Sequence, residues 1–94
     1  MKVAIVGSGI SGLAAARALA RHADVHLYDG ALRPGGHCYT VEVEGPRGGC
    51  AADMGFIVHN RENYPHFSRM LRELGVATRA TSMAFSVSLP HQDL

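Results

Sequence analysis

Apolar and polar positions follow two different periods along the chain, and these periods predict its secondary structure. Residues 3–6 form a continuous apolar run, which is typical of a parallel strand covered on both faces. An Ala- and Leu-rich segment over residues 13–21 predicts a helix. Residues 25–28 then alternate as a second strand would, and Asp29 ends it. The start of the chain therefore predicts one β-α-β unit with a right-handed crossover.

The remaining sequence changes to the pattern of a hairpin followed by a helix. Alternating residues over 39–53, around a Gly-rich turn at 45–49, predict two antiparallel strands. Residues 64–74 carry apolar side chains at helical spacing, and Gly75 is suited to end that helix. Residues 83–87 alternate weakly and predict a final strand. The fold class is therefore α/β, with a β-α-β core over residues 1–36 and a hairpin and helix over residues 37–94.

Three glycines separate the first strand from the first helix with the spacing GxGxxG. Gly7 permits a tight turn, Gly9 lets the backbone approach a pyrophosphate, and Gly12 lets helix and strand pack closely. The free N–H groups and partial positive charge of a helix N-terminus attract that anion. Asp29 ends the second strand, where a carboxylate accepts ribose hydroxyls and disfavours the 2′-phosphate of NADP. The candidate dinucleotide-binding residues here are Gly7, Ser8, Gly9, Ile10, Ser11, Gly12, Asp29 and Gly30.

The sequence of the loop after the second strand indicates which of the two dinucleotides, FAD or NAD, is the expected cofactor. Its sequence from Arg33 through Gly35, Gly36 and His37 to Thr40 resembles the R-x-G-G-R-x-x-[ST] motif of flavin-containing amine oxidases and phytoene-desaturase-like enzymes. The two glycines allow a second close backbone approach, and Arg33 can pair with a phosphate. His37 stands where that motif usually has Arg, so its charge at this contact depends on pH. The resemblance favours FAD over NAD.

Further segments extend the resemblance along nearly the whole chain. They are similar to bacterial predicted NAD/FAD-binding proteins of the amine-oxidoreductase type, and comprise residues 35–37, 53–58, 64–65, 74–76 and 83–88. Members of that family are several times longer than this chain. The resemblance implies an incomplete, N-terminal part of a Rossmann-like FAD/NAD(P)-binding domain without a complete substrate domain. It also implies that Gly55, Phe56 and Ile57 approach the flavin ring.

The resulting hypothesis is the FAD-binding segment of a flavin-dependent oxidoreductase. Such an enzyme would move a hydride from an amine or C–H bond of a small-molecule substrate to the flavin, which performs the electron chemistry. No catalytic residue can be named, and the 94 residues alone are expected to be inactive. Two alternatives stay open, namely the cofactor domain of an NAD-dependent dehydrogenase and a truncated nucleotide-binding fragment without catalysis.

Composition and residue spacing limit which partners and which cellular compartment are expected for this chain. A net charge of +1 with no Lys- or Arg-rich stretch argues against nucleic acid as a partner. The six histidines are scattered and do not predict a metal site. The apolar run near the N-terminus is too interrupted for a membrane span, although membrane association stays open. Cys38 and Cys50 match no zinc spacing, and on the predicted hairpin they would not face each other, so no disulfide is expected. Two free thiols favour the cytoplasm.

Overall fold

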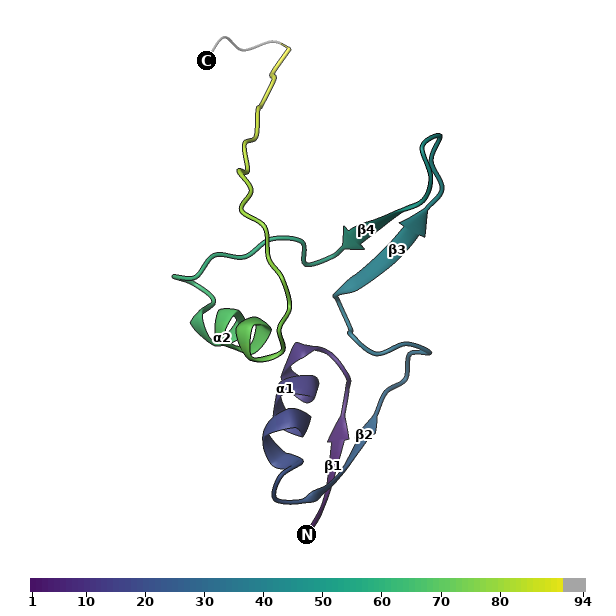
Figure 1. The fold of residues 1–94 in the computed structure, drawn as a ribbon, viewed down its shortest axis with the longest axis vertical. Coiled ribbons are helices and arrows are strands. Elements are labelled where there is room, and N and C mark those ends of the chain that lie inside the picture. Colours follow the sequence, from purple (N-terminus) through teal and green to yellow (C-terminus); the bar gives the residue numbers. More distant parts are fainter. Residues whose placement is uncertain (91–94) are drawn as a thin grey trace. The chain divides into compact units, whose positions relative to one another are not determined.

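The computed structural model describes residues 1–90, which form two compact units. The first is Met1–Val58, and the second comprises the described residues from His59 onward. Each unit has its own secondary structure and is described by itself (Figure 1).

The first unit begins with the predicted β-α-β arrangement. Strand β1 (Lys2–Val6) pairs in parallel with strand β2 (Asp24–Tyr28), and helix α1 (Ile10–Leu19) connects them. The register places Val6 opposite Tyr28, so the two strands end at the same level. The helix begins at Ile10, three residues before the predicted start. Ser11 and Gly12 in its first turn interrupt the apolar period on which the prediction relied, but they do not prevent helix formation.

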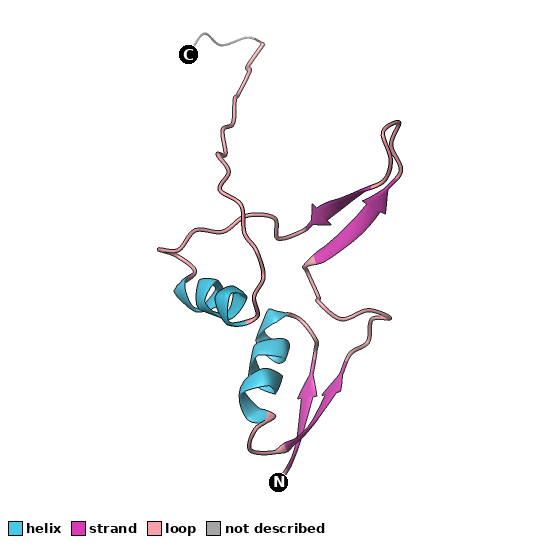
Figure 2. Ribbon diagram, viewed as in Figure 1, coloured by secondary structure: helices cyan, strands magenta, loops and turns pink. Residues whose placement is uncertain are grey.

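A hairpin completes the first unit. Strand β3 (Tyr39–Val43) runs antiparallel to strand β4 (Cys50–Met54), as the alternating pattern predicted (Figure 2). The opposed pair Thr40 and Asp53 is joined by a hydrogen bond of 2.8 Å from the Thr40 hydroxyl to the carboxylate. This hairpin is a separate two-stranded sheet from the one that β1 and β2 form. Both cysteines are free and exposed.

The second unit is built on helix α2 (Pro65–Glu73), whose end has the predicted form. Gly75 has a φ of +69°, in the left-handed region that favours glycine. Its N–H donates to the Arg72 carbonyl at 3.2 Å, and the Val76 N–H donates to the Leu71 carbonyl at 2.9 Å. These two bonds form a Schellman motif, which satisfies carbonyl groups at the helix end. The prediction that Gly75 ends this helix is confirmed.

The predicted strand over residues 83–87 is wrong. These residues are described but adopt no regular secondary structure. A strand needs a neighbour to pair with its backbone N–H and C=O groups, and residues 83–87 pair with neither of the two described sheets. Weak alternation alone therefore did not specify a strand here.

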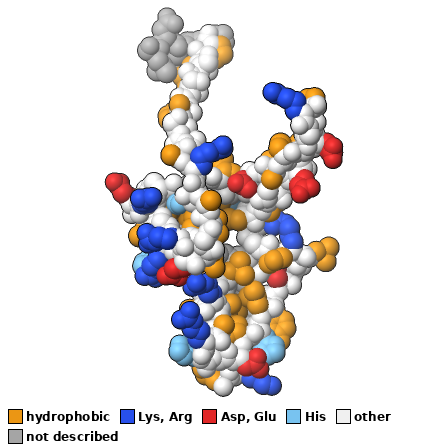
Figure 3. Space-filling model, in the orientation of Figure 1, with side chains coloured by type: hydrophobic (Ala, Val, Ile, Leu, Met, Phe, Trp, Pro, Cys, Tyr) orange, Lys and Arg blue, Asp and Glu red, His pale blue; other side chains and the backbone are white. Residues whose placement is uncertain are grey.

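The first unit has little apolar burial. Among residues 1–90 no apolar side chain is fully buried, and Ser8, at 2% exposure, is the one buried polar residue. Val6 and Tyr28, paired across β1 and β2, are 86% and 57% exposed. Apolar side chains accordingly cover much of the visible surface over α1, β1 and β2 (Figure 3). Backbone hydrogen bonds and close glycine contacts must therefore contribute much of the local order around the glycine loop.

Candidate functional site

The loop between β1 and α1 has the geometry that its glycines predicted. Gly7 has a φ of +97°, and its N–H donates to the Tyr28 carbonyl at 2.7 Å. Gly9 is the N-cap of α1, and its carbonyl accepts the Leu13 N–H at 3.0 Å. A Cβ added at Gly9 would meet no atom within 4 Å. The helix N-terminus, with its unpaired N–H groups, therefore adjoins open space beside Gly9.

Gly12 has the opposite surroundings. A Cβ at this position would overlap the Gly7 carbonyl oxygen and lie 3.5 Å from the Ile5 Cγ2 atom. The first turn of α1 thus lies directly on the end of β1. This is the close packing of helix and strand that the third glycine predicted.

A cleft of about 360 Å³ opens at this loop. It is lined by residues 6–12 apart from Ser8, together with Gly35, His37 and Cys38 of the following loop. The structure therefore brings both predicted cofactor-binding segments to one cleft. Its volume lies within the range of about 300–1,000 Å³ typical of small-molecule sites.

Asp29 lies at the end of β2 and is held by backbone and side-chain donors. Its Oδ2 accepts the Ser8 N–H at 2.6 Å and also a short hydrogen bond from the Ser8 hydroxyl, while its Oδ1 accepts the Ala31 N–H at 2.7 Å. The bond from the Ser8 hydroxyl is the largest cause that lowers the pKa of Asp29 to about 2, followed by the two backbone donors. A carboxylate offers roughly four acceptor positions, so about one remains, on Oδ1.

This arrangement refines two predictions from the sequence. Asp29 is ionised near neutral pH and retains acceptor capacity for one ribose hydroxyl. Ser8, one of the candidate dinucleotide-binding residues, directs its hydroxyl to Asp29 and does not line the cleft. Ser11, the other serine of the loop, does line it.

The loop after β2 docks on the glycine loop through its own two glycines. The Gly35 N–H donates to the Ser8 carbonyl at 2.9 Å. Gly36 has a φ of +59°, and a Cβ there would lie 2.8 Å from the Gly9 Cα atom. The second close backbone approach that the sequence predicted is thus, in the structure, an approach to the first loop.

Arg33 is turned toward its own loop. One guanidinium nitrogen, Nη1, donates to the Cys38 carbonyl at 3.3 Å, and the guanidinium carbon lies 4.1 Å from the centre of the Tyr39 ring. This is a cation–π geometry, and Arg33 does not line the cleft. The expected phosphate contact from Arg33 would need a different rotamer, whereas His37 already lines the cleft.

The remaining predicted residues do not line the cleft. Gly55 has a φ of +77°, and a Cβ there would overlap the His37 carbonyl oxygen. Phe56 is half-buried and Ile57 is 58% exposed. These residues, like Gly30, are absent from the cleft lining. Gly55 nevertheless brings the end of β4 against the loop that carries His37.

The described residues give two further findings about site chemistry. No three His, Cys, Asp or Glu side chains among residues 1–90 come together as a metal-binding group would require. Neither helix in that range has the length and apolar character needed to cross a bilayer.

Comparison with known proteins agrees with this geometry. The chain matches the family described as "NAD(P)-binding Rossmann-like domain" over residues 5–74, a range that includes the glycine loop, Asp29 and the docked loop. It is also similar to Protein FLOWERING LOCUS D of Arabidopsis thaliana, with 54% identity over 54 residues, which cover 56% of this chain and 7% of that relative. The chain thus spans a small part of this curated relative's length. The family match, which covers the β-α-β unit and its glycine loop, shows that the chain belongs to the NAD(P)-binding Rossmann-like domain family.

Proposed function

We propose that the chain is the cofactor-binding segment of a flavin-dependent oxidoreductase and that its dinucleotide is FAD. The observation that carries the proposal is the shared cleft. The loop that resembles flavin enzymes, with Gly35 and His37, lines the same cleft as the dinucleotide-binding glycine loop. A nicotinamide-binding domain would have no use for a second glycine pair at this place, so the docked loop supports FAD over NAD.

The residues present fit the ADP portion of such a cofactor. Gly9 leaves open space next to the N-terminus of α1, where backbone N–H groups would hold a pyrophosphate. Asp29 Oδ1 would accept a ribose hydroxyl, because Ser8 occupies Oδ2. His37 would donate to a phosphate oxygen from the second loop. The bound flavin would supply hydride chemistry toward an amine or C–H bond of a small-molecule substrate.

NAD is the second candidate, because the family description names NAD(P). Asp29 distinguishes between the two nicotinamide cofactors, since a carboxylate at this position accepts the hydroxyls of NAD and repels the 2′-phosphate of NADP.

The two exposed free thiols support the cytoplasm as the proposed compartment.

Absorption spectroscopy tests the proposal. The polypeptide that carries these residues should purify with flavin absorption bands and release FAD on heating. A colourless polypeptide that binds NADH would contradict FAD and favour the second candidate. On the 94-residue chain, amide chemical shifts during FAD and NAD titrations provide an independent test. FAD should shift the amides of Gly9, Ser11 and His37 at lower concentration than NAD does, and the reverse order would contradict the proposal.

A further inference from the structure

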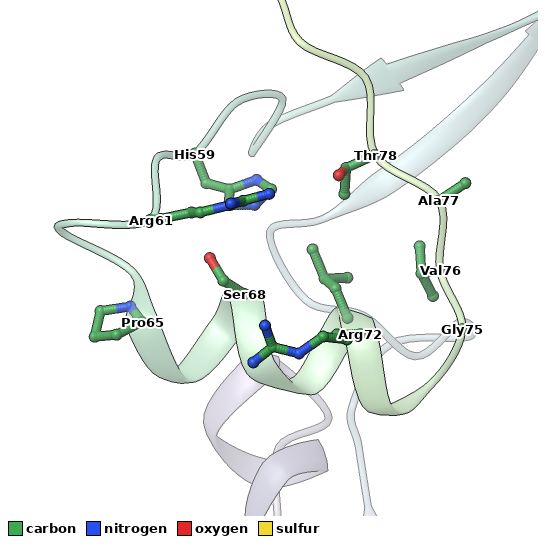
Figure 4. A pocket seen from close by; sticks show the side chains of 10 residues that line it. His59, Arg61, Pro65, Ser68, Arg72, Gly75, Val76, Ala77 and Thr78 are labelled. Atoms are coloured by element: carbon green, nitrogen blue, oxygen red, sulfur yellow. The ribbon is translucent and has the colours of Figure 1, made fainter.

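Helix α2 borders a second cavity that the proposed function does not use. Its volume is about 520 Å³, and all of its lining residues lie between His59 and Thr78. The turn before α2, one side of the helix and the backbone after Gly75 surround it (Figure 4). This volume is also within the range of about 300–1,000 Å³ expected of a small-molecule site.

The charged side chains that line this cavity are basic. Arg61 and Arg72 both line it, and no Asp or Glu does. Neither arginine forms an ion pair with another residue in the described part of the chain. Arg69, on the same helix, behaves differently, because its Nε lies 3.7 Å from the Glu73 carboxylate and its side chain is outside the lining. The cavity therefore carries uncompensated positive charge.

A serine hydroxyl in the same cavity lacks a hydrogen-bond partner. The Ser68 Oγ atom has less than 1 Å² of exposed surface and bonds to no group among residues 1–90. Buried hydroxyls almost always have a partner, because leaving one unpaired costs about 1–3 kcal/mol. Figure 4 shows this hydroxyl directed from α2 toward the side where His59 and Arg61 lie. With less than 1 Å² exposed, it is closed off from the cavity in this conformation, so the side chains that cover it would have to move before it could donate to an acceptor there.

The rest of the lining is largely apolar. Pro65 and Leu71 line the cavity from α2, and Val76 lines it from the segment after the helix. A ligand for this cavity would thus combine a compact anion with an apolar portion. Guanidinium groups recognise phosphate oxygens through paired N–H donors, and a hydroxyl adds a further donor.

We propose that this cavity binds a small organic phosphomonoester. Its phosphate would be held by Arg61, Arg72 and the Ser68 hydroxyl, and its organic portion would contact Leu71 and Val76. The site would be distinct from the glycine-loop cleft, since the two share no lining residue.

An NMR titration of the 94-residue chain with phenyl phosphate tests the proposal, with phenol and with sodium chloride at matched ionic strength as controls. Phenyl phosphate should cause saturable shifts in the amides of residues 59–78 and leave the amides of residues 7–12 unchanged. Phenol binding as tightly as phenyl phosphate would overturn the assignment of an anion site. A chain without dispersed signals for residues 59–78, with or without phenyl phosphate, would overturn the cavity and the proposal together.

Substitutions of the lining residues test which side chains hold the phosphate group of phenyl phosphate. Arg61→Gln and Arg72→Gln should each weaken phenyl phosphate binding about tenfold, because each removes charge-assisted hydrogen bonds. Ser68→Ala should also weaken binding without lowering the stability of the chain, because the lost hydroxyl has no partner there. Arg69→Gln is the control and should bind like the original chain. Equal weakening by Arg69→Gln and Arg61→Gln would show a nonspecific charge effect and overturn the proposal.

Discussion

The docking of the second glycine loop on the first can be tested by one substitution, Gly36→Ala. The added methyl group has two separate consequences. Gly36 has a φ of +59°, a conformation that costs an L-residue about 1–2 kcal/mol. The new Cβ would also lie 2.8 Å from the Gly9 Cα atom, too close for a backbone neighbour.

The magnitude follows from these two terms. An ordinary contact begins at 3.4 Å, so the loops must separate by 0.6 Å, the difference between 3.4 and 2.8 Å. Overpacking by a methyl group typically costs about 1–3 kcal/mol. Together with the backbone cost, Gly36→Ala should destabilise the docked loop by about 2–5 kcal/mol. The Gly35 N–H, which bonds to the Ser8 carbonyl at 2.9 Å, reports this loss directly.

Native-state hydrogen exchange of the Gly35 amide is the assay, because it measures the free energy of local opening. Gly75→Ala is the matched control, measured at its own N–H, since Gly75 has a similar φ of +69° but no atom within 4 Å of an added Cβ. Gly36→Asn separates the two terms, because Asn tolerates the left-handed conformation while its Cβ still overlaps the Gly9 Cα atom. If Gly36→Ala destabilised Gly35 no more than Gly75→Ala destabilises its own turn, the loop contact inferred from the structure would be refuted.

Three other predictions follow from the same unit. Ser8→Ala should raise the pKa of Asp29 from about 2 toward 3.8 in a carboxyl carbon-13 titration. Because the folded-state pKa of Asp29 is the lower one, the stabilisation that its ionised carboxylate gives is present above pH 3.8 and is lost as the pH falls toward 2. An unchanged pKa in Ser8→Ala would contradict the hydrogen bond. Gly9→Val should leave the fold intact but weaken FAD binding at least about tenfold by obstructing the phosphate approach, and unchanged affinity would give this loop another role. The chain should enhance the fluorescence of the apolar dye ANS because side chains such as Val6 and Leu32 are exposed, whereas no enhancement would indicate that these side chains are covered in solution.

The β-α-β unit was predictable because its signals are local. The apolar run before Gly7 and the fixed spacing to Gly9 and Gly12 specify a strand, a tight turn and a helix without reference to distant residues. The end of α2 was predictable for the same reason, since Gly75 alone supplies the left-handed conformation that its Schellman motif needs. Residues 83–87 were not, because strand formation depends on a partner that their own sequence cannot specify.

Within the candidate site, the glycine positions were predictable but two side-chain interactions were not. The Ser8 hydroxyl and Asp29 are separated by 21 residues in the sequence, and only the parallel pairing of β1 and β2 brings them together. Arg33 contacts Tyr39 because the loop between them folds back on itself at Gly35 and Gly36. Both interactions depend on the conformation of a loop, which motif spacing does not determine.

These contacts give Asp29 a structural role in addition to its proposed role toward the cofactor. Its carboxylate joins the end of β2 to the glycine loop through Ser8, and the Ser8 carbonyl in turn accepts the Gly35 N–H. One acidic side chain thus begins a chain of hydrogen bonds that connects both walls of the cleft. Because these bonds all lie within the chain, they hold both walls of the cleft in place, and such organisation would lower the ordering cost of binding a dinucleotide. By linkage, a dinucleotide that uses the remaining Oδ1 acceptor would stabilise the same loops that Asp29 already holds.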